Sequence, residues 1–272
     1  MSDGLFPAIR TARAPPRAGK AELTLDPLVL LLLAGVGALA GFVDAIAGGG
    51  GLLALPALLS AGLPPVAAFA TNKFQGSVGT TIAAITYWRR GYADLRSLLP
   101  AIAATAVGSL LGAIMVKRID TGVLSVAVPV ALIALAVYFV FAPKVTDQDS
   151  AARLPLLPFL PLLTLGLGFY DGVFGPGTGS FLTLGFVALF GFGVTRAAGS
   201  TKVVNLVSNL AALFFFIASD DVVWPAAIAM AIGQVSGGYL GALTGIRFGV
   251  KLIRPMVIII SVALALRLLL VP

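Results

Sequence analysis

The stretch GFVDAIAGGGGLLALP, residues 41–56, places four consecutive glycines, Gly48 to Gly51, inside an apolar run. Each glycine in a helix interior costs about 1 kcal/mol relative to alanine. A second stretch, GFYDGVFGPGTGSFL at residues 168–182, repeats the same spacing of aspartate and glycine. The two stretches therefore predict helices that are interrupted at equivalent places.

The composition around these stretches is that of a membrane protein. Of the 272 residues, 59% are hydrophobic and only 11% are charged, whereas an ordinary soluble domain carries about 25% charged residues. Windows without an ionisable side chain cover 97–116, 121–143, 154–170 and 222–246. A membrane-crossing helix needs about 20 such residues, and a large soluble core would need polar faces that these windows lack. The sequence thus predicts an all-α, polytopic membrane protein.

The residue types that are missing exclude several kinds of chemistry. The chain has no cysteine and no histidine, which removes the usual disulfide, zinc, haem and imidazole-base sites. GPGTGS at 175–180 lacks the Gly-Lys-Ser/Thr ending of a phosphate loop, so ATP is not the direct energy source. We expect no metal, no cofactor and no enzymatic activity. The net charge of +7 comes from basic residues in short loops, which set topology, so we expect no nucleic-acid partner.

The two glycine-rich stretches belong to a duplication of the chain. Five residues recur at an offset of 127: Gly41, Phe42, Asp44, Gly48 and Gly50 correspond to Gly168, Phe169, Asp171, Gly175 and Gly177. Four pairs share an offset of 129: Lys73 with Lys202, Gly108 with Gly237, Gly112 with Gly241, and Arg118 with Arg247. Chance matching would not keep one offset across charged residues. We predict a basic, disordered tail at 1–25, a first membrane repeat at 26–143, a loop at 144–154 and a second repeat at 155–272.

Each predicted repeat opens with a broken helix. Transporters built from internal repeats often interrupt one helix per repeat near the middle of the bilayer, and paired Gly-interrupted segments point to the binding site. The segments after the breaks, 52–61 and 179–190, are too short to cross a membrane. We therefore predict re-entrant helices and about four membrane segments per repeat. The GxxxG spacings at 108–112 and 237–241 predict close helix contacts.

The orientation of the repeats follows from their basic residues. If a re-entrant hairpin and three crossings make up each repeat, the repeats are inverted, and nine of the twelve basic side chains outside the tail share one face. If the first helix of each repeat crosses fully, the repeats are parallel and the same twelve divide six to six. The excess of basic residues in cytoplasmic loops favours the inverted arrangement.

Four ionisable residues lie inside apolar segments rather than at their ends. Asp44 and Asp171 each precede a glycine break, and Lys73 and Lys202 each lie about two turns into a later helix. Ionisable residues at membrane depth are costly and are functional candidates by default. We interpret the aspartates as coupling or gating groups.

The lysines and the broken helices together predict a site for a small oxyanion. Lysine supplies a compact charge, amides and hydroxyls supply direction, and helix N-termini at the breaks favour anions. The candidate substrate-binding residues are Lys73, Lys202, Thr71, Asn72, Gln75, Ser200, Thr201, Asn205, Gly48, Gly49, Gly50, Gly51, Gly175 and Gly177. Ser208 and Asn209 extend the polar set of the second lysine helix.

Two structural interpretations stay open beside this one. The glycines could serve only close helix crossing, as small residues often do in membranes. The lysines could pair within their own repeats, Lys73 with Asp44 and Lys202 with Asp171, as buried locks without a substrate. Both can coexist with transport, because an anion could displace the carboxylate partner.

The quoted stretches, together with ATNKFQGS at 70–77 and KLIRPMVIIISVAL at 251–264, resemble the TauE/SafE family of membrane proteins, which is named for sulfite export and organosulfur transport. The resemblance covers nearly all of residues 35–270. It implies a multi-pass permease of the cell (inner) membrane with duplicated halves and a small anionic substrate such as sulfite or an organosulfonate.

The function that we expect is therefore anion export driven by the membrane potential or an ion gradient. Moving one charge through 100 mV is worth about 2.3 kcal/mol, so a dianion leaving an inside-negative cell gains about twice that. One alternative is a proton-coupled carrier for another small anion such as a carboxylate, with Asp44 and Asp171 as proton sites. Another is a membrane subunit that transports nothing. The oligomeric state is not predicted.

Overall fold

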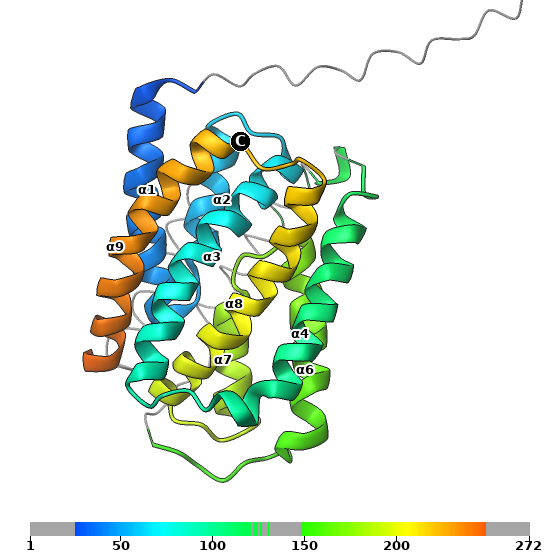
Figure 1. The fold of residues 1–272 in the computed structure, drawn as a ribbon. Coiled ribbons are helices and arrows are strands. Elements are labelled where there is room, and N and C mark those ends of the chain that lie inside the picture. The colour runs from blue at the N-terminus through cyan, green and yellow to red at the C-terminus, as the bar shows by residue number, and fades with distance from the viewer. Residues whose placement is uncertain (1–24, 121, 125, 127–129, 131–147, 249–272) are drawn as a thin grey trace, which may run out of the picture.

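The regular structure of this protein is helical throughout the described part of the chain. The computed structural model describes residues 25–120, 122–124, 126, 130 and 148–248 (Figure 1). Its helices are α1 (Pro27–Ala47), α2 (Gly50–Ser60), α3 (Pro65–Arg89), α4 (Leu95–Val116), α6 (Leu156–Val173), α7 (Thr178–Ala188), α8 (Val194–Ala218) and α9 (Trp224–Phe248). The predicted window at 121–143 lies almost entirely outside the described residues. So do residues 249–272 of the second predicted repeat, and the predicted tail apart from Leu25.

Five of these helices are long and apolar enough to cross a membrane: α1, α4, α6, α8 and α9. This confirms the predicted class, an all-α membrane protein with several spans. The helices that follow the glycine breaks, α2 and α7, have 11 residues each, which is about half of what a crossing needs. Helix α3 has 25 residues and is not among the five, because its polar residues lower its hydropathy.

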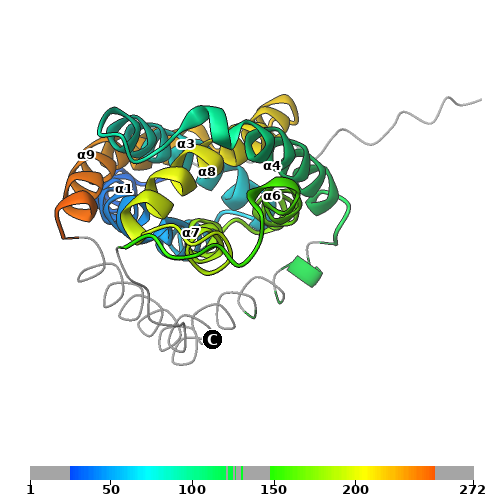
Figure 2. The ribbon, with the colours of Figure 1, turned by 90° about the horizontal axis from the view of Figure 1, so that it is seen from below.

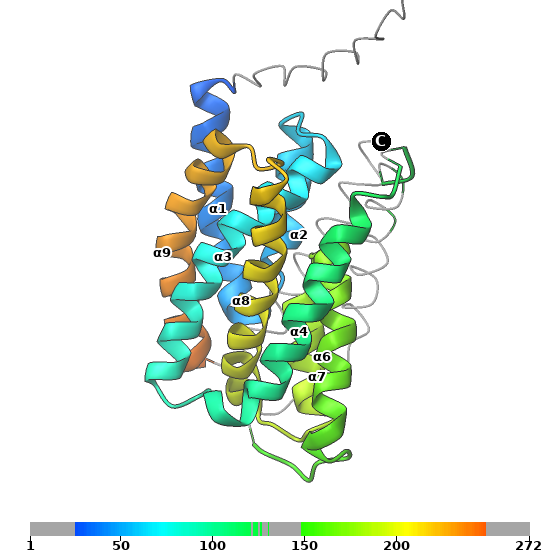
Figure 3. The same ribbon diagram turned by 45° about the vertical axis from the view of Figure 1, so that its right-hand side comes forward.

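The helices form three neighbouring groups. Helices α1 and α9 pack along one edge, α4 and α6 along the other, and α3 lies beside α8 between them (Figures 2 and 3). In Figure 1, α1 begins at the top of the bundle and α6 begins at the bottom. Helix α3 runs downward and α8 runs upward. The central pair is therefore antiparallel.

Glycines bring the two outer helix pairs into backbone contact. A Cβ atom on Gly108 or Gly112 of α4 would overlap the backbone oxygens of Leu165 and Phe169 on α6. On the other edge, Gly237 and Gly241 of α9 contact backbone oxygens of α1 in the same way, namely those of Ala38 and Phe42. The close contacts predicted from the GxxxG spacings are thus confirmed, and each joins a helix of the first half of the chain to one of the second.

Both glycine-rich stretches end a helix where the sequence predicts a break. Helix α1 stops at Gly48, which has a φ of 79° and donates its N–H to the Asp44 carbonyl at 2.8 Å. Between α6 and α7, Gly175 and Gly177 have φ values of 88° and 81°, a region in which side chains are strained. The two breaks touch, because a Cβ on Gly48 would lie 2.6 Å from the Cα of Gly179.

Two glycines of α1 provide a direct test of this packing. Gly37 lies against the Met230 backbone, whereas nothing lies within 4 Å of the Cβ position of Gly35. We expect Gly37→Ala to destabilise the protein by about 1–3 kcal/mol through overpacking, and Gly35→Ala to leave the melting temperature unchanged or higher because alanine favours a helix. Thermal unfolding of both purified variants in detergent measures this. Equal melting temperatures would contradict the assigned α1–α9 interface.

Candidate functional site

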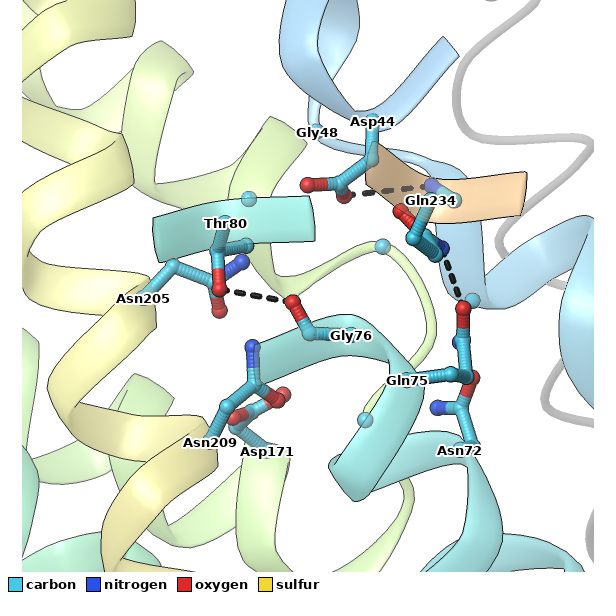
Figure 4. A pocket seen from close by; sticks show the side chains of 15 residues that line it. Asp44, Gly48, Asn72, Gln75, Gly76, Thr80, Asp171, Asn205, Asn209 and Gln234 are labelled. Carbon is cyan, nitrogen blue, oxygen red and sulfur yellow. Dashed lines mark hydrogen bonds between the residues drawn. The ribbon is translucent and has the colours of Figure 1, made fainter. Parts of the chain in front are cut away.

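The two helix breaks and the helices around them enclose a polar cavity. Its volume is about 30 Å³, and since a single water needs about 10–15 Å³, it has room for two or three water-sized groups. Its lining is Asp44, Gly48, Gly50, Gly51, Asn72, Gln75, Gly76, Thr80, Asp171, Gly175, Gly177, Gly179, Asn205, Asn209 and Gln234. Figure 4 shows these side chains converging from α1, α3, α6, α8 and α9. The cavity therefore lies where residues from both halves of the chain meet.

Two helices begin at this cavity without a side-chain cap. The cap residues of α2 and α7 are Gly49 and Gly177, and neither has a side chain that could accept the first backbone N–H groups. One of these groups, the N–H of Gly50, donates to Asp44 Oδ1 at 3.2 Å. A helix N-terminus carries a partial positive charge of about half an elementary charge and a C-terminus the opposite. Because α1 and α6 end at the same two breaks, the attraction for an anion comes from direct contact with the N–H groups of α2 and α7.

Both lysines are buried and both are paired, but the alternative in which each pairs within its own repeat is wrong. Lys73 Nζ lies 2.6 Å from Asp171 Oδ2, and Lys202 Nζ lies 3.1 Å from Asp44 Oδ2. Each lysine thus pairs with the aspartate of the other half of the chain, not with that of its own half. The reason is the packing, because the antiparallel α3 and α8 bring each lysine beside the opposite break.

Further hydrogen bonds complete each ion pair. Lys73 also donates to Asn209 Oδ1 at 3.1 Å, and Asp171 also accepts from the Ser208 hydroxyl at 2.5 Å. Lys202 also donates to the backbone carbonyl oxygen of Asp44. The exposed fraction of the Asp44 side chain is 15%, against 1–2% for the other three charged groups. Asp44 is therefore the most accessible of the four.

The structure divides the predicted binding residues into two sets. Those that line the cavity are Asn72, Gln75, Asn205, Gly48, Gly50, Gly51, Gly175 and Gly177, together with Asp44 and Asp171. The lysines lie directly behind this lining, with Lys73 Nζ 3.4 Å from the Cβ position of Gly175.

The remaining predicted residues have other surroundings. The Thr71 hydroxyl accepts the backbone N–H of Val223 at 3.1 Å, just before α9 begins. The Thr201 hydroxyl lies 3.1 Å from that of Thr183. Ser200 is buried, and neither it nor Gly49 belongs to the cavity lining. None of these four residues lines the cavity, and their role in ligand binding stays a prediction.

Five lining residues were absent from the predicted set: Gly76, Thr80, Gly179, Asn209 and Gln234. Gln234 had a usable signal, since it is the one side-chain amide within the apolar run 222–246. Asn209 belongs to the polar set of α8 that the sequence predicts beyond Asn205. Gly76 and Thr80 follow Lys73 at helical spacing and lie on the same face of α3. A glycine on that face has no polar side chain by which the sequence could mark it as part of a site.

The fold and this cavity define a polytopic membrane protein with a buried polar site at broken helices, as found in transporters. The family model described as sulfite exporter TauE/SafE matches residues 33–268. The chain therefore belongs to the TauE/SafE family.

Its relatives are named as transporters. It is 43% identical over 250 residues to "Probable membrane transporter protein ORF9" of a Sinorhizobium species, covering 91% of this chain and 94% of the relative. It is 41% identical over 245 residues to "Probable membrane transporter protein YfcA" of Escherichia coli K12, covering 90% and 91%. No solved structure matches it significantly. This is a membrane transporter family, which agrees with the expectation that the chain is not an enzyme.

The crossed ion pairs generate a prediction about stability. Removing one partner of a buried pair leaves an uncompensated charge, at a cost of about 3–5 kcal/mol. Because Lys73 pairs with Asp171, Lys73→Gln combined with Asp171→Asn leaves no unpaired charge and should remain folded. Lys73→Gln combined with Asp44→Asn strands two charges and should unfold or aggregate. Size-exclusion chromatography and melting temperature in detergent compare the two double variants. If the second double variant were the more stable, the lysines would instead be paired with the aspartates of their own halves.

Proposed function

We propose that this protein transports a small anion such as sulfite or an organosulfonate, and that it exports this anion across the inner membrane of the cell. The observation that carries the proposal is the meeting of the N-termini of α2 and α7 at a cavity whose two lining aspartates are each paired with a buried lysine. The family description names sulfite export. The cavity volume suits an ion of a few atoms.

The charges around the cavity support an anionic ligand. Each lysine is neutralised by an aspartate, so the two ion pairs together carry no net charge. The N-terminal N–H groups of α2 and α7 lie beside the C-termini of α1 and α6, and that of Gly50 already donates to Asp44, so the helix ends favour an anion where it contacts these N–H groups directly. An anion that enters can therefore interact with the helix ends first and compete with Asp44 or Asp171 for a lysine. Release of the aspartate during binding would link occupancy of the cavity to movement of α1 or α6.

The same proposal includes two inverted membrane repeats, each opened by a re-entrant helix. The contacts of Gly108 with Leu165 and of Gly237 with Ala38 support it, because the glycines are related by the offset of 129 and their partners by that of 127. The opposite starting ends of α1 and α6 in Figure 1 also support inversion over a parallel arrangement. We assign 26–143 and 155–272 to the repeats, 144–154 to the loop between them and 1–25 to the basic tail.

Two driving forces are compatible with this cavity. Export of an anion from an inside-negative cell is favoured by about 2.3 kcal/mol per charge per 100 mV, with no coupled ion required. The greater exposure of Asp44 relative to the other three charged groups favours a second candidate, a proton-coupled carrier in which this carboxylate takes up the proton.

Sulfite efflux from liposomes separates the two driving forces. A potassium diffusion potential alone should drive efflux in the first case, and a pH gradient should be required in the second.

Two neighbouring glycines test the site itself. A Cβ on Gly51 would lie 3.2 Å from the Cα of Pro176 and 3.5 Å from Asn72 Nδ2, at the cavity, whereas a Cβ on Gly49 would face the Leu52 side chain at 3.4 Å. We expect Gly51→Ala to reduce sulfite efflux at least about tenfold, because one methyl group removes about one water-sized volume from the cavity. We expect Gly49→Ala to transport at nearly the parental rate.

The measurement is stopped-flow efflux from liposomes with equal amounts of each folded variant. Parental efflux in Gly51→Ala would remove the cavity from the transport path. Absence of efflux in the parent for sulfite, methanesulfonate and acetate alike would overturn the proposed function as a whole.

A further inference from the structure

A chain of three side-chain amides runs from α9 to the edge of the cavity. Gln234 on α9 donates its Nε2 hydrogen to Gln75 Oε1 on α3. Gln75 in turn donates its own Nε2 hydrogen to Asn72 Oδ1 at 2.7 Å. All three side chains are buried, and Figure 4 shows Gln234, Gln75 and Asn72 one after another, with Asp44 near the Gln234 end.

The direction of these two hydrogen bonds decides whether Asn72 presents its oxygen or its NH₂ group to a ligand. Its oxygen is occupied by Gln75, so its Nδ2 group is the end that remains. That nitrogen lies 3.5 Å from the Cβ position of Gly51 and 3.7 Å from that of Gly175, both of which line the cavity. Within the described residues no acceptor is bonded to it. The amide therefore presents N–H donors to the cavity, as an anion requires.

The surroundings of Gln234 set this direction. Its Oε1 atom is enclosed against the backbones of Gly41 and Gly79 and has no hydrogen-bond partner within the described part of the chain. If all three amide groups rotated by 180°, both hydrogen bonds between them would still form in the reverse direction. The Gln234 NH₂ group would then occupy the enclosed position beside Gly41 and Gly79. One unpaired acceptor would then be exchanged for two unpaired donors, and each unpaired buried group is costly.

We infer that Gln234 is a positioning residue for the anion site, which through Gln75 holds Asn72 with its N–H groups toward the cavity. This inference rests on the proposed function. It assigns to α9 a role in ligand recognition that acts through Asn72 and does not depend on contact between Gln234 and the anion, although Gln234 also lines the cavity. The second cavity amide, Asn209, is oriented separately, since its oxygen accepts from Lys73.

The equivalent position in the first half of the chain provides a matched control. Under the offset of 129, Gln234 corresponds to Thr105 on α4. The Thr105 hydroxyl is also buried and also has no hydrogen-bond partner in the described residues, but Thr105 does not line the cavity. Thr105→Val thus alters a buried polar group at the corresponding depth without touching the amide chain.

The experiment is calorimetric titration of the purified full-length chain with sodium sulfite at pH 8 and pH 5.5. The readout is the ratio of the variant Kd to the parental Kd at each pH, in which the protonation of sulfite itself cancels. At pH 8, Gln234→Glu introduces a group that only accepts, so the chain reverses and Asn72 turns its oxygen to the cavity. We expect the ratio to be about ten or more, because one hydrogen bond to the ligand is lost and the introduced carboxylate, at the cavity lining, repels the anion. The uncharged Gln234→Met variant measures the first effect alone.

At pH 5.5 the introduced carboxyl group can be protonated and can donate again, so the ratio for Gln234→Glu should fall toward one. Gln234→Met cannot donate at either pH, so its ratio should stay raised at both. Thr105→Val should give a ratio below about two at both, as expected for a site without a shared partner. In an Asn72→Ala background, Gln234→Met should have no further effect, because Gln234 acts only through Asn72.

A ratio near one for Gln234→Glu at pH 8 overturns the inference. So does an equal effect of Gln234→Met with and without Asn72, which would mean a general structural role. If the parent binds sulfite and only these results fail, the proposed function stands without the positioning role. If the parent binds neither sulfite nor methanesulfonate, both are overturned.

Discussion

Two buried ion pairs that cross between the halves of the chain hold the site of this transporter together. An ammonium group in a membrane interior is tolerated only when a counter-charge and further hydrogen bonds accompany it. Lys73 on α3 obtains both from Asp171 and Asn209, and Lys202 on α8 obtains them from Asp44. Since each aspartate lies on the last turn or so of a helix before its break, the pairs hold the breaks against the central helices. The cavity exists between them as a result.

Much of this arrangement is predictable from the sequence because it depends on residue type. Consecutive glycines in an apolar run lead to helix breaks, and lysines at membrane depth lead to a buried polar site. The identity of their partners is not predictable in that way. An internal offset relates equivalent positions, but neighbours depend on which helices pack, and here α1 lies on α9 and α3 lies beside α8. The same limit applies to Thr71, which precedes Asn72 by about 100° around α3 and so reaches Val223 rather than the cavity.

The cavity also departs from the symmetry that the predicted duplication implies. Asn205 and Asn209 of α8 correspond, at the offset of 129, to Gly76 and Thr80 of α3, and all four line the cavity. Large amides on one side thus face a glycine and a short hydroxyl on the other. Two sets of large side chains would fill the space between α3 and α8, and two sets of small ones would leave it without donors. Sequence reasoning that selects polar residues alone finds only the α8 side of this pair.

The polar residues of α3 affect how this helix is inserted into the membrane during synthesis. It is long enough to cross a membrane but is not apolar enough to count among the candidate spans, and Lys73, about two turns into the helix, opposes its insertion. Its polar face is covered by α8 and α9, which leave the ribosome more than 100 residues later. The helix that carries half of the site therefore reaches its final stability only after the end of the chain is synthesised, and truncated chains lack the partners that keep it in the bilayer.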